Sequence, residues 1–166
     1  MSSTIYLAIP VLLLLAVVQT AVLPHFPIFG LVPQLPFLVA LAWGLLRGMD
    51  EGIVWAFVGG LLLDLFSVAP VGVTSLSYML AIIAVIWIEN AMPADRFFIP
   101  VIMAVAATVI SLLVYLILLR LLGYPTTLQG AAALLPTAIL HGVLILPIYW
   151  LMFYLNRIFR PRPVEL

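Results

Sequence analysis

The sequence predicts an all-α integral membrane protein: a single transmembrane domain over residues 1–166, built as a bundle of six helices. Hydrophobic residues make up 67% of the chain and charged residues only 7%, whereas soluble domains contain about 25% charged residues. A soluble fold of this length has too little interior to bury so much apolar surface. Apolar stretches also recur at lengths near the roughly 20 residues that a spanning helix needs. Composition and spacing together therefore indicate a membrane bundle.

The first three helices are predicted over residues 5–23, 33–47 and 52–67. No basic residue precedes the first stretch and no clear small-residue cleavage site follows it, so it is predicted as a membrane helix rather than a signal peptide. A segment rich in Pro and Gly, residues 23–36, separates it from the second helix. The second and third helices are short for spanning. We expect them to form a tilted hairpin, or one of them to extend into its flanking loop.

The last three helices are predicted over residues 71–89, 98–122 and 131–155. The uncharged turn SVAPVG precedes the fourth helix, the polar segment ENAMPADR follows it, and GYPTT follows the fifth. Pro100 fits the first turn of a helix. Three further prolines are expected to kink helices, which membrane helices tolerate when neighbours satisfy the freed carbonyls: Pro10, Pro136 and Pro147.

The placement of arginine predicts that both termini face the cytoplasm. Six spans would put one group of arginines on one side of the membrane: Arg47, Arg96, Arg157, Arg160 and Arg162. Arg120 lies toward the other side, and cytoplasmic segments carry the excess of basic residues. The tail arginines are expected to anchor this topology, with contact to anionic lipid headgroups as the alternative. The tryptophans are expected to form an aromatic belt at the cytoplasmic helix ends, or else to fill space: Trp43, Trp55, Trp87 and Trp150.

Small residues recur at every fourth position before Asp64, which ends the series: Gly48, Gly52, Ala56 and Gly60. From Gly52 onward they share one face of the third predicted helix. Lipid provides no hydrophobic drive between helices, so close packing at small residues must hold membrane helices together. We expect the neighbour on this face to be a helix of the same protein, with a partner's helix as the alternative.

Asp64 lies within an apolar stretch, where a carboxylate costs roughly 2.5–3.5 kcal/mol to insert and should have a partner. Arg120 is the expected partner, because it lies at a similar predicted depth near the end of the fifth helix. A local hydrogen bond to Ser67 and a pairing with His141 are the alternatives. A proton or ion relay through Asp64 and His141 is a further alternative, although an isolated His is more often a hydrogen-bonded residue between helices.

The sequence carries no motif of a known catalytic site. Intramembrane aspartyl chemistry needs a second carboxylate, and Asp64 is the only acid well inside a predicted span. Three serines could be nucleophiles with His141 as base, but no nucleophile motif surrounds them: Ser75, Ser77 and Ser111. There is no HExxH, phosphate loop or cluster of metal ligands, no cysteine, and the net charge is zero. We therefore expect no enzymatic activity, cofactor, metal or nucleic-acid partner.

Residues 33–76 resemble the MreD family of bacterial rod shape-determining membrane proteins. That family shows a Pro-Asp-Leu-like start, a helix ending near Arg-Gly, glycines leading into LLLDLL, and a Ser/Gly-Pro-x-Gly turn. The matching positions in this chain are Pro33, Leu35, Arg47, Gly48, Gly52, Gly60, Asp64, Pro70 and Gly72. Gln34 departs from the acidic residue often found after the proline, which puts any role of that acid in doubt. The length, the six spans and the short loops also fit.

The resemblance implies a non-enzymatic scaffold subunit of the cell-elongation complex in the bacterial cytoplasmic (inner) membrane. It implies binding to MreC, a single-span protein, and indirect action with MreB filaments, RodA and a class B penicillin-binding protein in lateral peptidoglycan synthesis. The family is similar in architecture to the substrate-binding subunits of energy-coupling-factor transporters. A vitamin-binding transporter subunit is therefore the alternative function. It is disfavoured because the outer loops carry few polar groups, and because Ala16 and Ala21 are five positions apart and do not form an Ala-x3-Ala surface.

Overall fold

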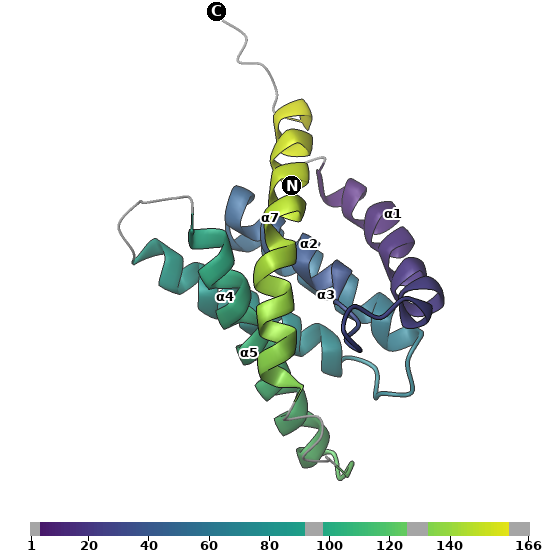
Figure 1. Ribbon diagram of the computed structural model, residues 1–166. Helices are drawn as coiled ribbons and strands as arrows, with labels where there is room; N and C mark the ends of the chain where they lie inside the picture. The colour runs from purple at the N-terminus through teal and green to yellow at the C-terminus, as the bar shows by residue number, and fades with distance from the viewer. Residues whose placement is uncertain (1–3, 92–97, 126–132, 160–166) are drawn as a thin grey trace, which may run out of the picture.

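A computed structural model of the chain describes residues 4–91, 98–125 and 133–159, and this part of the chain is all-helical, as predicted. Figure 1 shows its α-helices, which are α1 (Thr4–Val17), α2 (Leu35–Arg47), α3 (Met49–Leu65), α4 (Val73–Asn90), α5 (Ile99–Leu121) and α7 (Leu134–Phe159). Most bounds lie within a few residues of the predicted ones. The first two residues of the last predicted helix, 131 and 132, lie outside the described residues, and α7 continues past the predicted end at Leu155.

Within the described residues, four helical segments are long and apolar enough to cross a membrane: Tyr6–His25, Val73–Asn90, Ile99–Leu121 and Leu134–Ile158. The protein is therefore an integral membrane helical bundle. At 1.5 Å per residue, the 13 residues of α2 and the 17 residues of α3 extend about 20 and 26 Å, less than the roughly 30 Å of a bilayer core. The prediction that these two helices are short is confirmed.

The first span does not stay α-helical to its end. After α1, which contains Pro10, the chain forms a π-helical turn, η1 (Val18–Val22), and a 3₁₀ turn, η2 (Leu23–His25). A tight turn follows, in which Ile28 and Leu31 exchange both backbone hydrogen bonds. Its two central residues, Phe29 and Gly30, have positive φ angles of 51° and 79°.

The short helix α2 is the centre of the bundle. Pro36 through Gly44 are all buried, and α2 contacts α1, α3, α4, α5 and α7. The surrounding helices therefore cover the middle of α2 on every side and shield it from lipid. The longest two helices, α5 and α7, pack side by side, and α5 begins with Pro100 in its first turn, as predicted.

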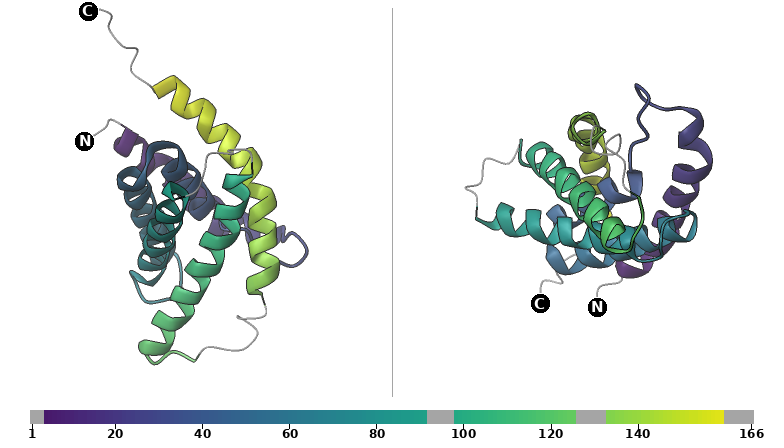
Figure 2. Two further views of the ribbon diagram at one scale, coloured as in Figure 1. Left: turned by 90° about the vertical axis from the view of Figure 1, so that its left-hand side faces the viewer. Right: turned by 90° about the horizontal axis from the view of Figure 1, so that it is seen from below.

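Both chain ends lie on one side of the bundle. Figure 2 shows the start of α1 and the end of α7 on the same side, which we call the terminal end, and the opposite side is the distal end. The starts of α2, α4 and α7 and the ends of α3 and α5 lie at the distal end. This arrangement agrees with an even number of crossings. The compartment that each end faces stays a prediction, and Arg96, Arg160 and Arg162 lie outside the described residues.

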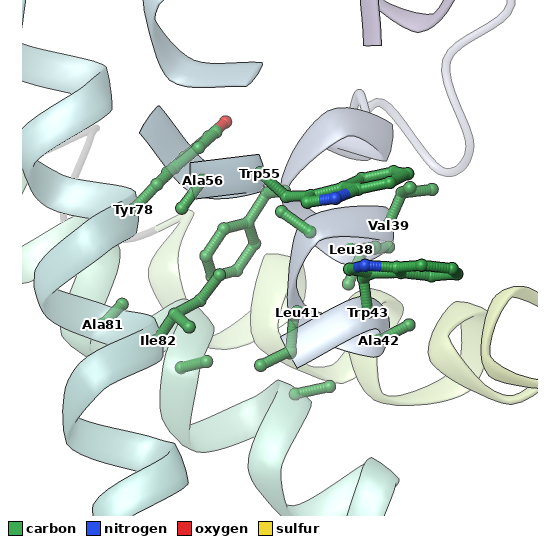
Figure 3. Packing of buried hydrophobic residues seen from close by; sticks show 14 of the residues in the cluster. Leu38, Val39, Leu41, Ala42, Trp43, Trp55, Ala56, Tyr78, Ala81 and Ile82 are labelled. Carbon is green, nitrogen blue, oxygen red and sulfur yellow. The ribbon is translucent and has the colours of Figure 1, made fainter. Parts of the chain in front are cut away.

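The tryptophans divide into two groups, and the prediction of a single belt was wrong for two of them. Trp43 and Trp55 are fully buried, and their rings stack with centroids 4.8 Å apart (Figure 3). Stacked aromatic rings at such a centroid distance attract each other. Trp87 and Trp150 have exposed side chains toward the terminal ends of α4 and α7, where an aromatic belt would lie.

Candidate functional site

The carboxylate of Asp64 caps the start of the next helix. Asp64 lies in the last turn of α3 and is 1% exposed. Its Oδ2 accepts hydrogen bonds from the backbone N–H groups of Gly72 at 2.8 Å, Thr74 at 3.2 Å and Ser75 at 3.4 Å. The first N–H groups of a helix have no partner within it, and the positive end of the helix dipole favours a negative charge. Asp64 therefore satisfies the start of α4 from the neighbouring helix.

The expected ion pair between Asp64 and Arg120 is not formed. Within the described residues, the one ion pair recorded joins Arg47 to Glu51, and the side chain of Arg120 is exposed at the distal end of α5. The backbone, rather than a cation, compensates the carboxylate. Ser67 also fails as a partner of the carboxylate, because its hydroxyl donates to the backbone carbonyl of Asp64 at 3.3 Å.

Gly72 makes the turn before α4 possible. Its φ angle of 99° lies in the left-handed region, which glycine adopts without steric cost. The carbonyl of Pro70 accepts the N–H of Val73 at 3.2 Å within the same turn. Pro70, Gly72 and Asp64, which the resemblance marked together, thus meet at one helix junction.

The small face of α3 packs against other helices of this chain. A Cβ atom on Gly60 would lie 2.4 Å from the Cα and 2.6 Å from the N of Ser75 in α4. At Gly52 it would lie 2.8 Å from the Cα of Gly44 in α2. Ala56, between them, is completely buried. The intramolecular interpretation of this stripe is therefore the one that the structure supports, and Gly44, which lies outside the stripe, forms part of the contact.

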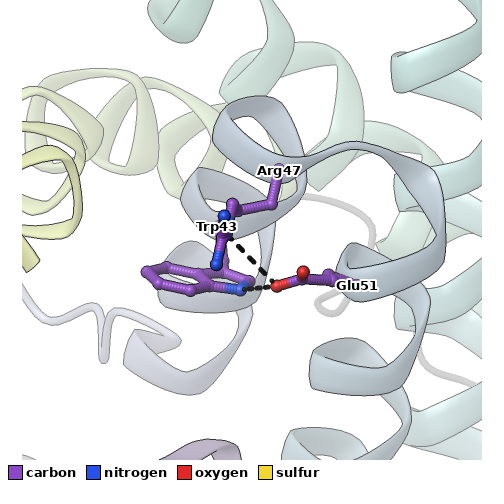
Figure 4. A network of polar contacts seen from close by, with 3 residues as sticks. All are labelled: Trp43, Arg47 and Glu51. Carbon is purple, nitrogen blue, oxygen red and sulfur yellow. Dashed lines mark hydrogen bonds and ion pairs between the residues drawn. The ribbon is translucent and has the colours of Figure 1, made fainter. Parts of the chain in front are cut away.

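Gly48 has a different role from the rest of the stripe. It joins α2 to α3 with a φ angle of 96°, and a Cβ atom there would meet nothing within 4 Å. Beside this turn, Trp43 Nε1 donates to Glu51 Oε2 at 2.9 Å, and Arg47 Nε lies 3.5 Å from the same oxygen (Figure 4). The guanidinium of Arg47 also lies 5.6 Å from the ring centroid of Trp43, within cation–π range.

His141 holds the start of α2 in the same way that Asp64 holds the start of α4. It is completely buried in α7, and its Nε2 accepts the backbone N–H of Gln34 at 3.0 Å. Gln34 follows the buried Pro33 and caps α2. The other ring nitrogen, Nδ1, lies 2.9 Å from Thr108 Oγ1 in α5, and that hydroxyl donates to the carbonyl of Ala104 at 2.6 Å. The network fits a neutral ring with its proton on Nδ1.

A second side chain, which the sequence analysis did not single out, completes this capping. Gln19 in η1 accepts the backbone N–H of Leu35 through its Oε1 at 2.9 Å. Pro36 has no N–H to satisfy. The buried polar residues of η1, α5 and α7 thus converge on the start of α2. A polar residue in an apolar stretch was the available signal for Gln19, as it was for Asp64 and His141.

The residues considered for a relay or a serine mechanism are engaged elsewhere. In the described part of the chain, no hydrogen bond joins Asp64 to His141. The serine hydroxyls donate to backbone carbonyls: Ser75 to Phe57, Ser77 to Val73 and Ser111 to Thr108. The Ser75 hydrogen bond joins α4 to α3, whereas those of Ser77 and Ser111 lie within α4 and α5.

Comparison with known families gives a match over almost the whole chain. The sequence model described as "rod shape-determining protein MreD" matches residues 1–159 of the 166-residue chain. No curated protein and no solved structure matches the chain. The similarity in architecture to the substrate-binding subunits of energy-coupling-factor transporters therefore stays a prediction.

Proposed function

Because this chain belongs to the MreD family and so has a role in rod shape determination, we propose that it is a non-enzymatic scaffold that binds MreC in the cytoplasmic membrane. Through MreC it would act with MreB, RodA and a class B penicillin-binding protein in lateral peptidoglycan synthesis. The observation that carries this proposal is that the buried polar groups bind the starts of neighbouring helices. Asp64 and His141 both hold helix starts in place, which is the chemistry of a rigid frame.

We assign α1 as the helix that receives the single span of MreC. The inward face of α1 carries Ala8, Leu12 and Ala16, which are all completely buried and lie at every fourth position. The opposite face exposes large apolar side chains: Tyr6, Ile9, Leu13, Leu14 and Val17. Of the four long spans, the one that contains α1 is the least buried within the bundle. A partner's helix could cover this face without displacing any contact of the chain.

Disulfide cross-linking tests this proposal directly, because the chain contains no cysteine. Single substitutions Leu14→Cys in α1, Ile117→Cys in α5 and Val143→Cys in α7 would be paired with a series of single cysteines along the span of MreC. All three positions are exposed apolar residues, so the last two are matched controls. We expect cross-links to Leu14→Cys alone. Cross-links only to the α5 or α7 position would refute the assignment of α1, and failure of MreC to co-purify with the unmodified chain would refute the scaffold proposal.

A further inference from the structure

A pocket of about 260 Å³ lies in the distal half of the bundle, between η1, α3, α4 and α5. Apart from Leu63 and Leu112, every residue that lines it has a polar side chain, although the chain as a whole is 67% hydrophobic. Ligand pockets in proteins are typically apolar with a few placed polar groups. Most of the surface that faces this pocket is apolar, and the hydroxyls of Thr20, Ser77 and Ser111 already donate to backbone carbonyls. The pocket therefore has this typical composition, with a small number of polar groups free to contact an occupant.

Several hydrogen-bonding groups in the pocket are fixed at one end and free at the other. The carbonyl oxygen of Gln34 accepts the hydroxyl of Tyr78 at 3.2 Å, and that of Gln19 accepts the N–H of Leu35 at 2.9 Å. Within the described residues, neither side-chain NH₂ group has a hydrogen-bond partner, and the hydroxyl of Tyr115 has none. The two amide donors are oriented before anything binds, because the carbonyl end of each amide is already held, and this lowers the entropic cost of binding.

The charge around the pocket selects a neutral occupant. In the part of the chain that the structure describes, no charged side chain lines the pocket, so an anion would have no cation to balance it. Thr74, a wall residue, donates its backbone N–H to the carboxylate of Asp64 at 3.2 Å, which places a negative charge just behind the wall. A cation would find the oxygens of that carboxylate already engaged by backbone N–H groups. Burying an uncompensated charge is far more costly than burying a neutral polar molecule.

The local backbone and the volume define the size of the occupant. Gln19 and Thr20 belong to the π-helical turn η1, and π-bulges occur frequently at functional sites. At about 30 Å³ for each water of the liquid, the pocket holds the volume of roughly nine waters. A molecule of about ten non-hydrogen atoms has this size.

We propose that this pocket binds a small neutral molecule whose carbonyl or hydroxyl oxygens accept hydrogen bonds from Gln19, Gln34 and Tyr115. The site lies entirely within this chain and goes beyond the scaffold role. It does not depend on MreC, so the two proposals can fail separately.

Two pairs of probes test the proposal by ligand-observed NMR on the full chain in lipid nanodiscs. Nicotinamide and nicotinate have the same ring and differ in charge, and glucose and glucuronate differ in the same way. We expect at least one neutral probe to bind and its anionic counterpart to bind at least tenfold more weakly. A pocket that holds only water would bind neither neutral probe, and that result, or equal binding of the anion, would overturn the proposal.

The variant Tyr115→Phe tests whether the probe binds in this pocket. The substitution removes one free donor and breaks no hydrogen bond among the described residues, so folding is expected to be unchanged. Loss of one hydrogen bond should weaken binding of the neutral probe about fivefold. Tyr154→Phe, at an exposed position toward the terminal end of α7, is the matched control and should leave binding unchanged. Equal affinities of the two variants would show that the probe binds elsewhere and would refute the site.

Discussion

At the scale of single residues, replacement of Asp64 tests the capping role. Asp64→Asn removes the charge that faces the start of α4 and turns an amide NH₂ toward backbone donors that need an acceptor. Hydrogen bonds to charged groups contribute about 1.5–3 kcal/mol, and we expect a loss of stability of that size. Arg120→Gln should change stability by less than about 0.5 kcal/mol, as exposed substitutions usually do. Unfolding of the detergent-solubilised protein would measure both.

The double variant separates the capping role from an ion pair. If Asp64 acts through the backbone of residues 72–75, the effects of Asp64→Asn and Arg120→Gln should add, since the two residues share no partner in the described part of the chain. If Arg120→Gln lowered stability as much as Asp64→Asn does, and the double variant lost no further stability, the result would support the ion pair.

The sequence identifies Asp64 and His141 as residues that need a partner, because an ionisable side chain in an apolar stretch is costly. It does not identify the partners. Matching predicted depths pairs side chains with side chains, and therefore pairs Asp64 with Arg120. The actual donors are N–H groups at helix starts, such as those of Gly72 and Gln34. Every helix start offers such groups, so only the packing of the helices decides which carboxylate or imidazole reaches them.

At the scale of helices, two adjacent glycines of α3 give a matched test of close packing. A Cβ atom on Gly60 would lie 2.4 Å from the backbone of Ser75, whereas on Gly59 its nearest neighbours would be side-chain atoms of Leu12 and Pro36 at 3.4 Å. Alanine stabilises a helix by about 1 kcal/mol relative to glycine. We expect Gly59→Ala to be neutral or stabilising and Gly60→Ala to destabilise by about 1–3 kcal/mol, as overpacking does.

Thermal unfolding in detergent measures this pair of variants. The two substitutions share the same helix, the same change in propensity and the same added volume, so any difference reports the contact with α4. Equal stabilities for Gly59→Ala and Gly60→Ala would show that α3 and α4 are not in close contact at Gly60.

The helices themselves follow from apolar length, and their bounds could be predicted to within a few residues. The contact face of α3 also follows, because small residues at every fourth position mark it. The helix that packs against this face cannot be predicted from the same spacing. Gly44, which meets Gly52, lies four positions before Gly48 and continues the same spacing into α2, but spacing along the chain does not show that α2 folds back onto α3. Trp43 and Trp55 likewise stack inside the bundle, because a short central helix buries every face, which its sequence alone does not reveal.

At the scale of the whole molecule, the side of the membrane that each end faces is the remaining prediction. The start of α1 and the end of α7 lie on one side of the bundle (Figure 2). Arg47 and Arg157 lie at that terminal end. Arg120 lies in the last turn of α5, at the distal end. Basic residues are retained on the cytoplasmic side. The terminal end should therefore be cytoplasmic and the distal end periplasmic.

Single cysteines measure this orientation, because the chain has none of its own. Val68, in the turn between α3 and α4 at the distal end, is fully exposed, and Ile158, at the terminal end of α7, is 73% exposed. A membrane-impermeant maleimide applied to intact spheroplasts should label Val68→Cys at once and Ile158→Cys only after the membrane is permeabilised. The reverse order would invert the topology. Labelling of both positions from outside would place the two ends of the bundle in the same compartment. That result would contradict a bundle whose terminal and distal ends lie on opposite sides of the membrane.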